Sequence, residues 1–387
     1  GSYQGDLGHV WKNLNIYLEN NTLESIDDLN YYSNRTPLIY ILHKYLNPLT
    51  ENIYSFRISV FFLSIISPIL FYFCLARKYS NVKKIYLVLI SVTLLLSPYF
   101  RTSSYWGLEE NFGIISTLIA FIFYLKYKEI KSNKNIFLLV FFSSLCLYFD
   151  QKLLIVPLIL FFNIIFSDDQ LKNKVILIFT YFLFSLPYFY LIFRWQGIFP
   201  PSHKELHDFN TVLWDNIIYT ISIMSIYFAP FLFLKKDKIT HIKKVFFDKF
   251  FLISLLALIS LIFYVEIFYI RPEFGFHSNF DGGGAIRKLS FILFESPLVQ
   301  KIFLLTSALF GWAIIYSFID NKNIYIILFY LILSPFIYPL YQETFDPILI
   351  ILILLCFFEE PQIDLKNFIF VSVYFSIFLL SAIFYYK

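Results

Sequence analysis

Residues 250–270 read FFLISLLALISLIFYVEIFYI, and the one charged residue among them is Glu266. A stretch of about twenty apolar residues is long enough to cross the ~30 Å hydrocarbon layer of a bilayer as an α-helix. The stretch lacks the alternation of polar and apolar residues that a strand of a membrane β-barrel shows. Because only helices and closed barrels satisfy the backbone hydrogen bonds in lipid, it predicts a transmembrane helix.

The composition of the whole chain agrees with this local pattern. Of the 387 residues 58% are hydrophobic, 22% aromatic and 15% charged, and the mean hydropathy is +0.67. Soluble domains are about 45–50% apolar and about 25% charged. We therefore expect an all-α polytopic membrane protein with about twelve transmembrane helices. The apolar segments that predict them are 59–76, 85–99, 112–125, 136–148, 153–166, 175–193, 216–234, 250–270, 302–319, 324–340, 347–358 and 368–386. The two segments beside residues 149–152 also fit a re-entrant hairpin.

Lysines are concentrated in every second loop between these segments, which is typical of the cytoplasmic side of a membrane protein. These inner loops hold Arg77, Lys78, Lys83 and Lys84, then four lysines in 126–134, Lys172 and Lys174, and six lysines in 235–249. The other loops have fewer basic residues and more Trp, Gly, Pro and His, so they are predicted to face outward. They comprise residues 100–111, 149–152, 194–215, 271–301 and 341–346.

The net charge of +4 follows from these topology-setting lysines and does not indicate a nucleic-acid partner. Cys74, Cys146 and Cys356 lie in apolar segments without metal-ligand spacing, which favours small buried hydrophobic residues. No metal site is predicted, and a divalent metal cofactor has no support from the residues.

Residues 1–57 precede an outside-to-inside segment, so we expect them on the outer face, with 58–387 forming the transmembrane bundle. A helix preceding residue 1 is expected to carry them across. Two amphipathic helices are predicted here. The first has Val10, Leu14, Tyr17 and Leu18 on one side. The second opens at Pro37 and presents Leu38, Ile41, Leu42 and Tyr45. Such helices lie flat on the membrane surface or pack as lids over the bundle.

The first candidate for chemistry is Asp6 with His9 one helical turn away. A carboxylate just above the outer interface can serve as a general base toward a hydroxyl group, with a neighbour tuning its pKa. The alternative is structural, because aspartate before an amphipathic helix is a favourable N-cap.

A second candidate is the outer loop that contains Arg101, Trp106, Glu109 and Glu110. It is more polar than a connection requires. One of the glutamates can supply a second acid, and Arg101 can hold a phosphate oxygen. The alternative is that both acids stabilise the dipole at the start of the next helix.

The long outer loop 271–301 contains Arg271, His277, Arg287 and Lys288 beside the glycines 282–284. The glycines do not precede Gly-Lys-Ser/Thr, so they are a poor match to a nucleotide P-loop. Glycine hinges and cations suit closure over a phosphorylated substrate, while a flexible connector is the structural alternative. The loop 194–215, with His203, has a weaker pattern of the same kind.

Together these motifs resemble the GT-C superfamily, which comprises integral-membrane glycosyltransferases that use polyprenyl-phosphate-linked sugars. Asp6 and His9, followed by Arg35-Thr36-Pro37-Leu38-Ile39-Tyr40, are similar to the first outer loop of its dolichyl-phosphate-dependent branch. Residues 98–109 are similar to that branch's second loop, and residues 341–347 to its late outer motif. The chain departs from the usual pair of acids, because Leu7 follows Asp6.

The resemblance implies direct transfer of a sugar, with inversion, from a polyprenyl-phosphate donor to a glycan, lipid or protein acceptor. Asp6 would be the base, Glu109 or Glu110 a supporting acid, and Arg271, Arg287 or Lys288 the cations on the lipid phosphate. Further substrate contacts are expected from His9, Arg101, Trp106, His203 and His277. The expected location is a bacterial cytoplasmic membrane, with the active site facing the periplasm or exterior.

Two other classes of protein share parts of this pattern. A polysaccharide polymerase or O-antigen ligase also has about a dozen spans and a large late outer loop, but it should tolerate Asp6→Asn better than a transferase with Asp6 as base. A transporter of lipid-linked substrates should place polar residues at mid-membrane depth. The centres of these apolar segments are nearly free of charge, which disfavours transport.

Overall fold

The computed structural model describes residues 2–33, 35–198, 200, 212–235, 245–269 and 282–385, and within them it contains helices and no β-strand. The expected all-α class is therefore confirmed. Six helices in this described part are long and apolar enough to cross a membrane. They indicate a multi-pass membrane protein. The six are Ile53–Lys78, Leu171–Trp195, Asp215–Leu234, Lys249–Ile267, Pro297–Tyr316 and Leu365–Phe384.

The remaining apolar segments also contain helices, but several of these helices are short or bent. Residues 85–99 were expected as one span, whereas the helix over Lys84–Leu96 bends by 69° into Pro98–Trp106. Ser97 causes the change of direction locally, because it leaves the helical conformation and its side chain caps the next helix through the Phe100 N–H. A pattern of apolar residues predicts that a helix forms, but it does not reveal such a bend.

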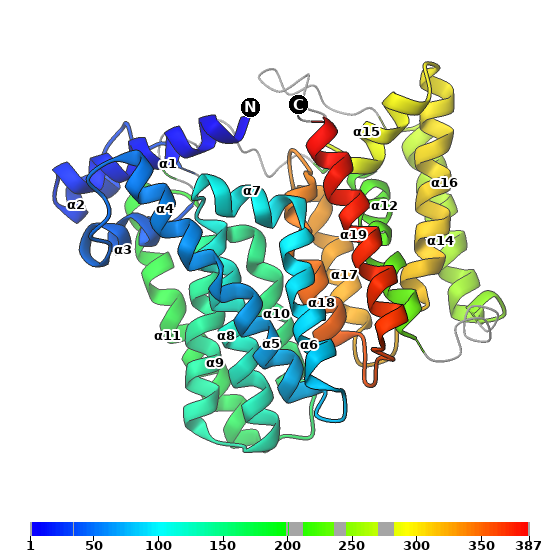
Figure 1. Ribbon diagram of the computed structural model, residues 1–387, viewed down its shortest axis with the longest axis horizontal. Helices are drawn as coiled ribbons and strands as arrows, with labels where there is room; N and C mark the ends of the chain where they lie inside the picture. Colours follow the sequence, from blue (N-terminus) through cyan, green and yellow to red (C-terminus); the bar gives the residue numbers. More distant parts are fainter. Residues whose placement is uncertain are drawn as a thin grey trace. The chain divides into compact units, whose positions relative to one another are not determined.

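The chain divides into two compact units, residues 1–208 with 379–387, and residues 209–378. Residues 1–57 belong to the first unit. Its helices (Figure 1) are α1 (Ser2–Glu19), α2 (Thr22–Asp27), α3 (Leu38–Leu46), α4 (Ile53–Ser64), α5 (Ile66–Lys78), α6 (Lys84–Val92), η1 (Thr93–Leu96), α7 (Pro98–Trp106), α8 (Glu110–Glu129), α9 (Asn133–Phe149), η2 (Gln151–Leu154), α10 (Ile155–Ile165) and α11 (Leu171–Trp195).

Within this first unit, α5, α8, α9 and α11 pack in sequence as neighbours, while α1, α3 and α7 lie at one end of them (Figure 1). Helix α1 contacts both α3 and α7, and α3 contacts α9. The Trp195 N–H donates to the Ile26 carbonyl at 3.1 Å, and Arg194 pairs with Asp27. Residues 1–57 are thus docked onto the ends of several helices.

The apolar face predicted for α1 is confirmed, because Val10, Leu14 and Tyr17 are buried there. The face predicted for α3 is wrong in part. Tyr45 is 64% exposed, and the buried side chains are Ile39, Tyr40 and His43. The reason is tertiary: the Tyr40 ring stacks on Tyr17, and the His43 ring meets Phe56 and Phe112 edge-on.

The second unit contains α12 (Asp215–Phe228), η4 (Ala229–Leu234), α14 (Lys249–Ile267), α15 (Gly284–Leu293), α16 (Pro297–Tyr316), α17 (Ile324–Leu333), η5 (Ser334–Phe336), η6 (Gln342–Thr344), α18 (Ile348–Cys356) and most of α19 (Leu365–Tyr385). Helix α12 packs against α16, which also contacts α14 and α15. Residues 284–293 were expected in an outer loop, so helix α15 is an addition to the predicted elements.

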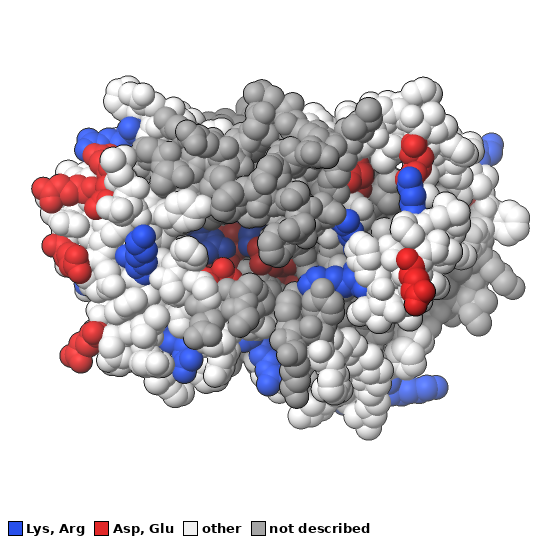
Figure 2. Space-filling view, turned by 90° about the horizontal axis from the view of Figure 1, so that it is seen from above, with Lys and Arg blue, Asp and Glu red and all other residues white. Residues whose placement is uncertain are grey.

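On the face of the molecule that Figure 2 shows, charged side chains of the described residues are sparse. Figure 2 shows one face of the molecule, on which the described Lys, Arg, Asp and Glu residues lie in small separate groups among uncharged residues. On this face the described residues do not form a continuous basic surface of the kind that binds nucleic acid.

Candidate functional site

Arg35, in the connection between α2 and α3, is the centre of a buried charged cluster in the first unit. Its backbone is held in place because its carbonyl accepts a hydrogen bond from the Tyr31 hydroxyl at 2.9 Å. The neighbouring Thr36 hydroxyl donates to the carbonyl of Tyr148. The Arg35 side chain is 16% exposed. Local anchoring on both sides therefore directs the guanidinium into the bundle.

The guanidinium of Arg35 binds both glutamates at the start of α8. Its Nη1 lies 2.5 Å from Glu109 Oε1, and its Nη2 contacts Glu110 Oε1. The Tyr99 hydroxyl from α7 donates to the same Glu110 oxygen at 2.6 Å. Glu109 and Glu110 are 2% and 5% exposed. The predicted acid pair is thus a buried ion cluster built by three separate segments.

Two further charges adjoin this cluster from the connection between α9 and α10. Asp150 is 4% exposed, and the Lys152 ammonium lies 5.6 Å from the centre of the Tyr99 ring. Both interact electrostatically with Glu110. Two cations therefore face three carboxyl groups in a site with little access to water.

The pKa values of Glu109 and Glu110 are shifted in opposite directions. Burial raises the pKa of Glu109 above its ordinary value, and the adjacent Glu110 adds to this effect, against the attraction of Arg35. For Glu110 burial also acts upward, but Arg35 and Lys152 outweigh it and hold its pKa below the ordinary value. Pairs of acids separated in this way can divide the roles of proton donor and carboxylate.

The Oε2 atoms of Glu109 and Glu110 are buried and have no hydrogen-bond partner among the described residues. Buried polar atoms are normally paired, so these two atoms mark either a proton-holding site or a ligand contact. A metal is the obvious ligand for carboxylates, but the described residues contain no group of three or more His, Cys, Asp or Glu that could hold a metal ion.

The other predicted residues of the first unit lie nearer the surface. Asp6 is exposed on α1, four residues after the helix begins at Ser2, so the alternative of an N-cap is wrong. His9 is exposed, with its ring 6.0 Å from that of Tyr32. Arg101 is exposed, and Trp106 is half-buried beside Arg57.

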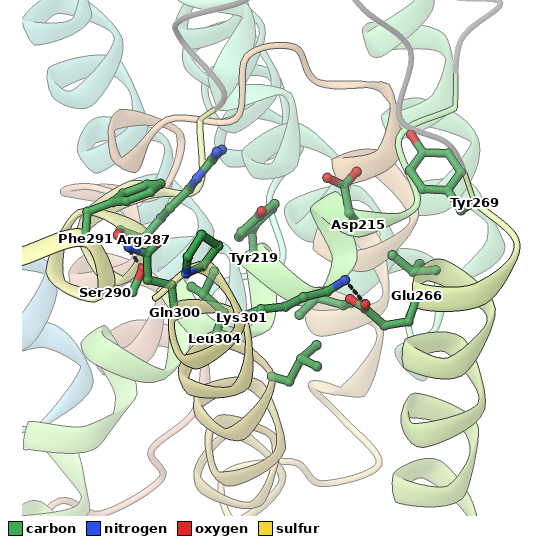
Figure 3. A pocket seen from close by; sticks show the side chains of 14 residues that line it. Asp215, Tyr219, Glu266, Tyr269, Arg287, Ser290, Phe291, Gln300, Lys301 and Leu304 are labelled. Atoms are coloured by element: carbon green, nitrogen blue, oxygen red, sulfur yellow. Dashed lines mark hydrogen bonds and ion pairs between the residues drawn. The ribbon is translucent and has the colours of Figure 1, made fainter. Parts of the chain in front are cut away.

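The second unit has a pocket of its own, with a cavity volume of about 280 Å³ (Figure 3). Residues from α12, α14, α15 and α16 line it, together with Tyr269, which follows α14. Across it the Lys301 ammonium pairs with the Glu266 carboxylate, and Figure 3 shows Tyr219 between Arg287 and Asp215 in this view. The charged and polar lining residues are Asp215, Tyr219, Glu266, Tyr269, Arg287, Ser290, Gln300 and Lys301.

Three successive glycines place Arg287 at this pocket. Gly282, Gly283 and Gly284 all have positive φ, at 70°, 85° and 62°. A Cβ on Gly282 would lie 2.7 Å from the Leu340 carbonyl oxygen, and that same carbonyl accepts the Gly283 N–H at 2.9 Å. Glycine is required because the backbone is left-handed and in close contact. The glycines expected as hinges are therefore held against residues 340–342, with α15 starting directly after them.

The pocket lies at one end of the helices that line it. Asp215 begins α12, Glu266 is near the end of α14, and Lys301 is in the second turn of α16. The predicted inner lysines occur at the opposite helix ends, where η4 is followed by Lys235 and α14 begins at Lys249. The lining thus combines cations with carboxylate, amide and hydroxyl groups, which can donate and accept hydrogen bonds.

Of the predicted cationic site, Arg287 lines the pocket, and Lys288 follows it on α15. His203, Arg271 and His277 lie outside the described residues. Sequence reasoning missed the role of Arg35, Asp215 and Lys301. A signal existed for Arg35, since it begins the motif 35–40 that carries part of the family resemblance, but its partners are 74 and 75 residues further along the chain.

Comparison with known proteins gave no match: no family model, no curated protein and no solved structure corresponds to the chain. A function is therefore inferred from the residues and the geometry of the two sites alone.

Proposed function

We propose that this chain is an integral-membrane glycosyltransferase of the GT-C type, which moves a sugar from a polyprenyl-phosphate donor to a hydroxyl acceptor on the outer face of a bacterial cytoplasmic membrane. The observation that supports it best is the pocket of the second unit. It combines two cations with two carboxylates and lies at the ends of three helices that can cross a membrane. A lipid-linked donor requires such a position, because its tail stays in the bilayer.

In this proposal the pocket binds the sugar phosphate headgroup. Arg287 binds phosphate oxygens, because a planar guanidinium forms charge-assisted hydrogen bonds with such groups. Asp215, Gln300 and Tyr269 accept or donate hydrogen bonds to sugar hydroxyls. Lys301 is available for the phosphate when Glu266 turns to a sugar hydroxyl. The volume of about 280 Å³ suits a headgroup of this size, with the prenyl chain outside.

The reaction is a displacement with inversion at the anomeric carbon. An acceptor oxygen forms the new glycosidic bond while the bond from the anomeric carbon to the phosphate oxygen breaks, and the phosphate keeps the electron pair. Cations stabilise the charge that is left on the phosphate. The acceptor proton passes to a carboxylate. The family resemblance gives that role to Asp6, and Asp215 is the base that the pocket itself offers.

The test uses the purified chain in lipid nanodiscs with polyprenyl-phosphate hexose or pentose, native membrane extract as the source of acceptor, and an assay for released polyprenyl phosphate. Arg287→Gln should raise the donor KM about tenfold or more, since it removes a charge-assisted contact. Asp6→Asn should lower kcat about 100-fold or more. The matched control is Asp27→Asn, which changes an exposed ion pair and should leave turnover unchanged.

The outcomes separate the assignments. Loss of turnover in Asp215→Asn together with full turnover in Asp6→Asn would transfer the role of base to Asp215. No release of polyprenyl phosphate by the unmodified chain from either donor, or unchanged kinetics in all three pocket and base variants, would overturn the proposal.

A further inference from the structure

Arg57 in the first unit lies among three aromatic rings at the start of α4. Its guanidinium carbon is 5.0 Å from the centre of the Tyr105 ring, 5.8 Å from that of Trp106 and 5.9 Å from that of Tyr54. Tyr54 and Tyr105 are 68% and 52% exposed. We call these four residues the Arg57 cluster. It is a cation on an open aromatic surface.

The Arg57 cluster is rigidly built. Asn52 caps α4 by accepting hydrogen bonds from the Tyr54 and Ser55 N–H groups at 3.1 and 3.0 Å. Gly107, which ends α7, has a φ of 71°, and a Cβ there would lie 3.1 Å from the Arg57 Cα. The close approach of α7 to α4 thus depends on glycine and holds the rings around the guanidinium.

The charge of Arg57 has no local compensation. No described residue forms an ion pair with it, in contrast to Arg77 at the other end of the same Ile53–Lys78 helix, which pairs with Glu129 at 2.5 Å. A cation near a helix N-terminus is also disfavoured by the helix dipole. Arginine is less frequent on the outer side of membrane proteins, where topology does not require it. We therefore infer that an anion from outside the chain compensates the charge of Arg57.

The depth of the cluster indicates where that anion is. Arg57 is the fifth residue of a helix long enough to cross the bilayer, and the inner lysine-rich loop begins at the opposite end. Trp and Tyr are enriched at the level of lipid headgroups. Arg101 is exposed one helical turn from Tyr105 on α7, so it extends the same surface with a second cation.

We propose that the Arg57 cluster binds the headgroup of an anionic phospholipid in the outer leaflet. The guanidinium contacts the phosphodiester, and the rings of Tyr54, Tyr105 and Trp106 lie at the glycerol level and orient the lipid. This site does not depend on the glycosyltransferase activity. It gives Trp106 and Arg101 of the first unit a contact with lipid.

The experiment adds phosphatidylglycerol or phosphatidylcholine to the detergent-solubilised chain and counts bound lipids by native mass spectrometry, without any sugar donor. The chain should prefer phosphatidylglycerol, and Arg57→Gln should weaken its first binding step about fivefold. Arg77→Gln is the matched control, an arginine on the same helix whose charge is already paired, and should bind as the unmodified chain does. Excess inorganic phosphate should not displace the lipid.

Arg57→Lys keeps the charge and should retain most of the preference. The melting temperature of each variant is measured in parallel, so that a fold defect is recognised. Equal binding of phosphatidylglycerol by Arg57→Gln and the unmodified chain would overturn the proposal. So would displacement by inorganic phosphate, which would indicate a site for small anions, or equal losses in Arg57→Gln and Arg57→Lys at unchanged melting temperature.

Discussion

The buried cluster around Arg35 and the pocket that contains Arg287 both combine arginine with carboxylates, but they compensate charge in different ways. In the first, Arg35 is enclosed with Glu109 and Glu110, which are at most 5% exposed. In the second, the Lys301–Glu266 pair has side chains that are 53% and 24% exposed, beside a cavity open to a ligand.

This difference indicates that the charges around Arg35 stabilise the structure, whereas those of the pocket are suited to binding a ligand. An enclosed cluster loses stability when one partner is removed, because a charge remains buried without compensation. Partly solvated pairs contribute little to stability, so they are free to exchange partners with a ligand. The cluster around Arg35 therefore holds residues 1–57 against the start of α8, while the pocket is the better candidate for binding a substrate.

The largest expected effect is that of Arg35→Ala. It leaves the paired glutamates without their shared cation and should destabilise the first unit by about 3 kcal/mol, measured by thermal or denaturant unfolding in detergent. Lys301→Ala in the pocket should change stability far less, since the side chain is half exposed. Similar losses of stability in both variants would contradict the distinction between the two sites.

An intermediate loss of stability is expected for Gly282→Ala. The φ of 70° and the approach of a Cβ to within 2.7 Å of the Leu340 carbonyl oxygen should cost about 1–3 kcal/mol and displace α15 with Arg287. Unfolding and donor binding should both be impaired. Gly5→Ala is the control, because nothing lies within 4 Å of its Cβ and alanine favours a helix. Unchanged donor binding in Gly282→Ala would argue against the positioning role of the glycines.

The smallest effect is a pH dependence that the two glutamates should show with opposite sign. The pKa of Glu109 is raised, so the folded state binds its proton more tightly, and stability should fall as pH rises from the ordinary value of 4.5 through the raised value. Glu109→Gln should remove this fall. The pKa of Glu110 is lowered, so its contribution is present above 4.5 and lost as pH falls below it.

Unfolding followed by tryptophan fluorescence across this range measures both effects, and Glu24→Gln, at an exposed glutamate, supplies the control. The result that would contradict the assignment is a fall of stability on raising pH that persists in Glu109→Gln and disappears in Glu110→Gln. That reversal would exchange the two roles in the buried cluster.

Much of the local structure was predictable from the chain alone. Helix α11 covers the apolar segment 175–193, and α14 covers residues 250–267 of the segment 250–270. Val10, Leu14 and Tyr17 are buried on α1. Both features were predictable because partition into lipid and amphipathic packing depend on residues close together in sequence. The bend at Ser97 and the buried face of α3 were missed, since neighbouring helices select among conformations that the local pattern allows equally.

The two sites depended on tertiary structure. Asp6, Glu109 and Arg287 were recognisable as reactive types, but the partner of Glu109 is 74 residues away, and the pocket takes its lining from four helices. Helix formation is a local equilibrium that the sequence determines by its hydrophobic pattern. The pairing of charges depends on which helix faces meet, and that choice is made only when the helices pack.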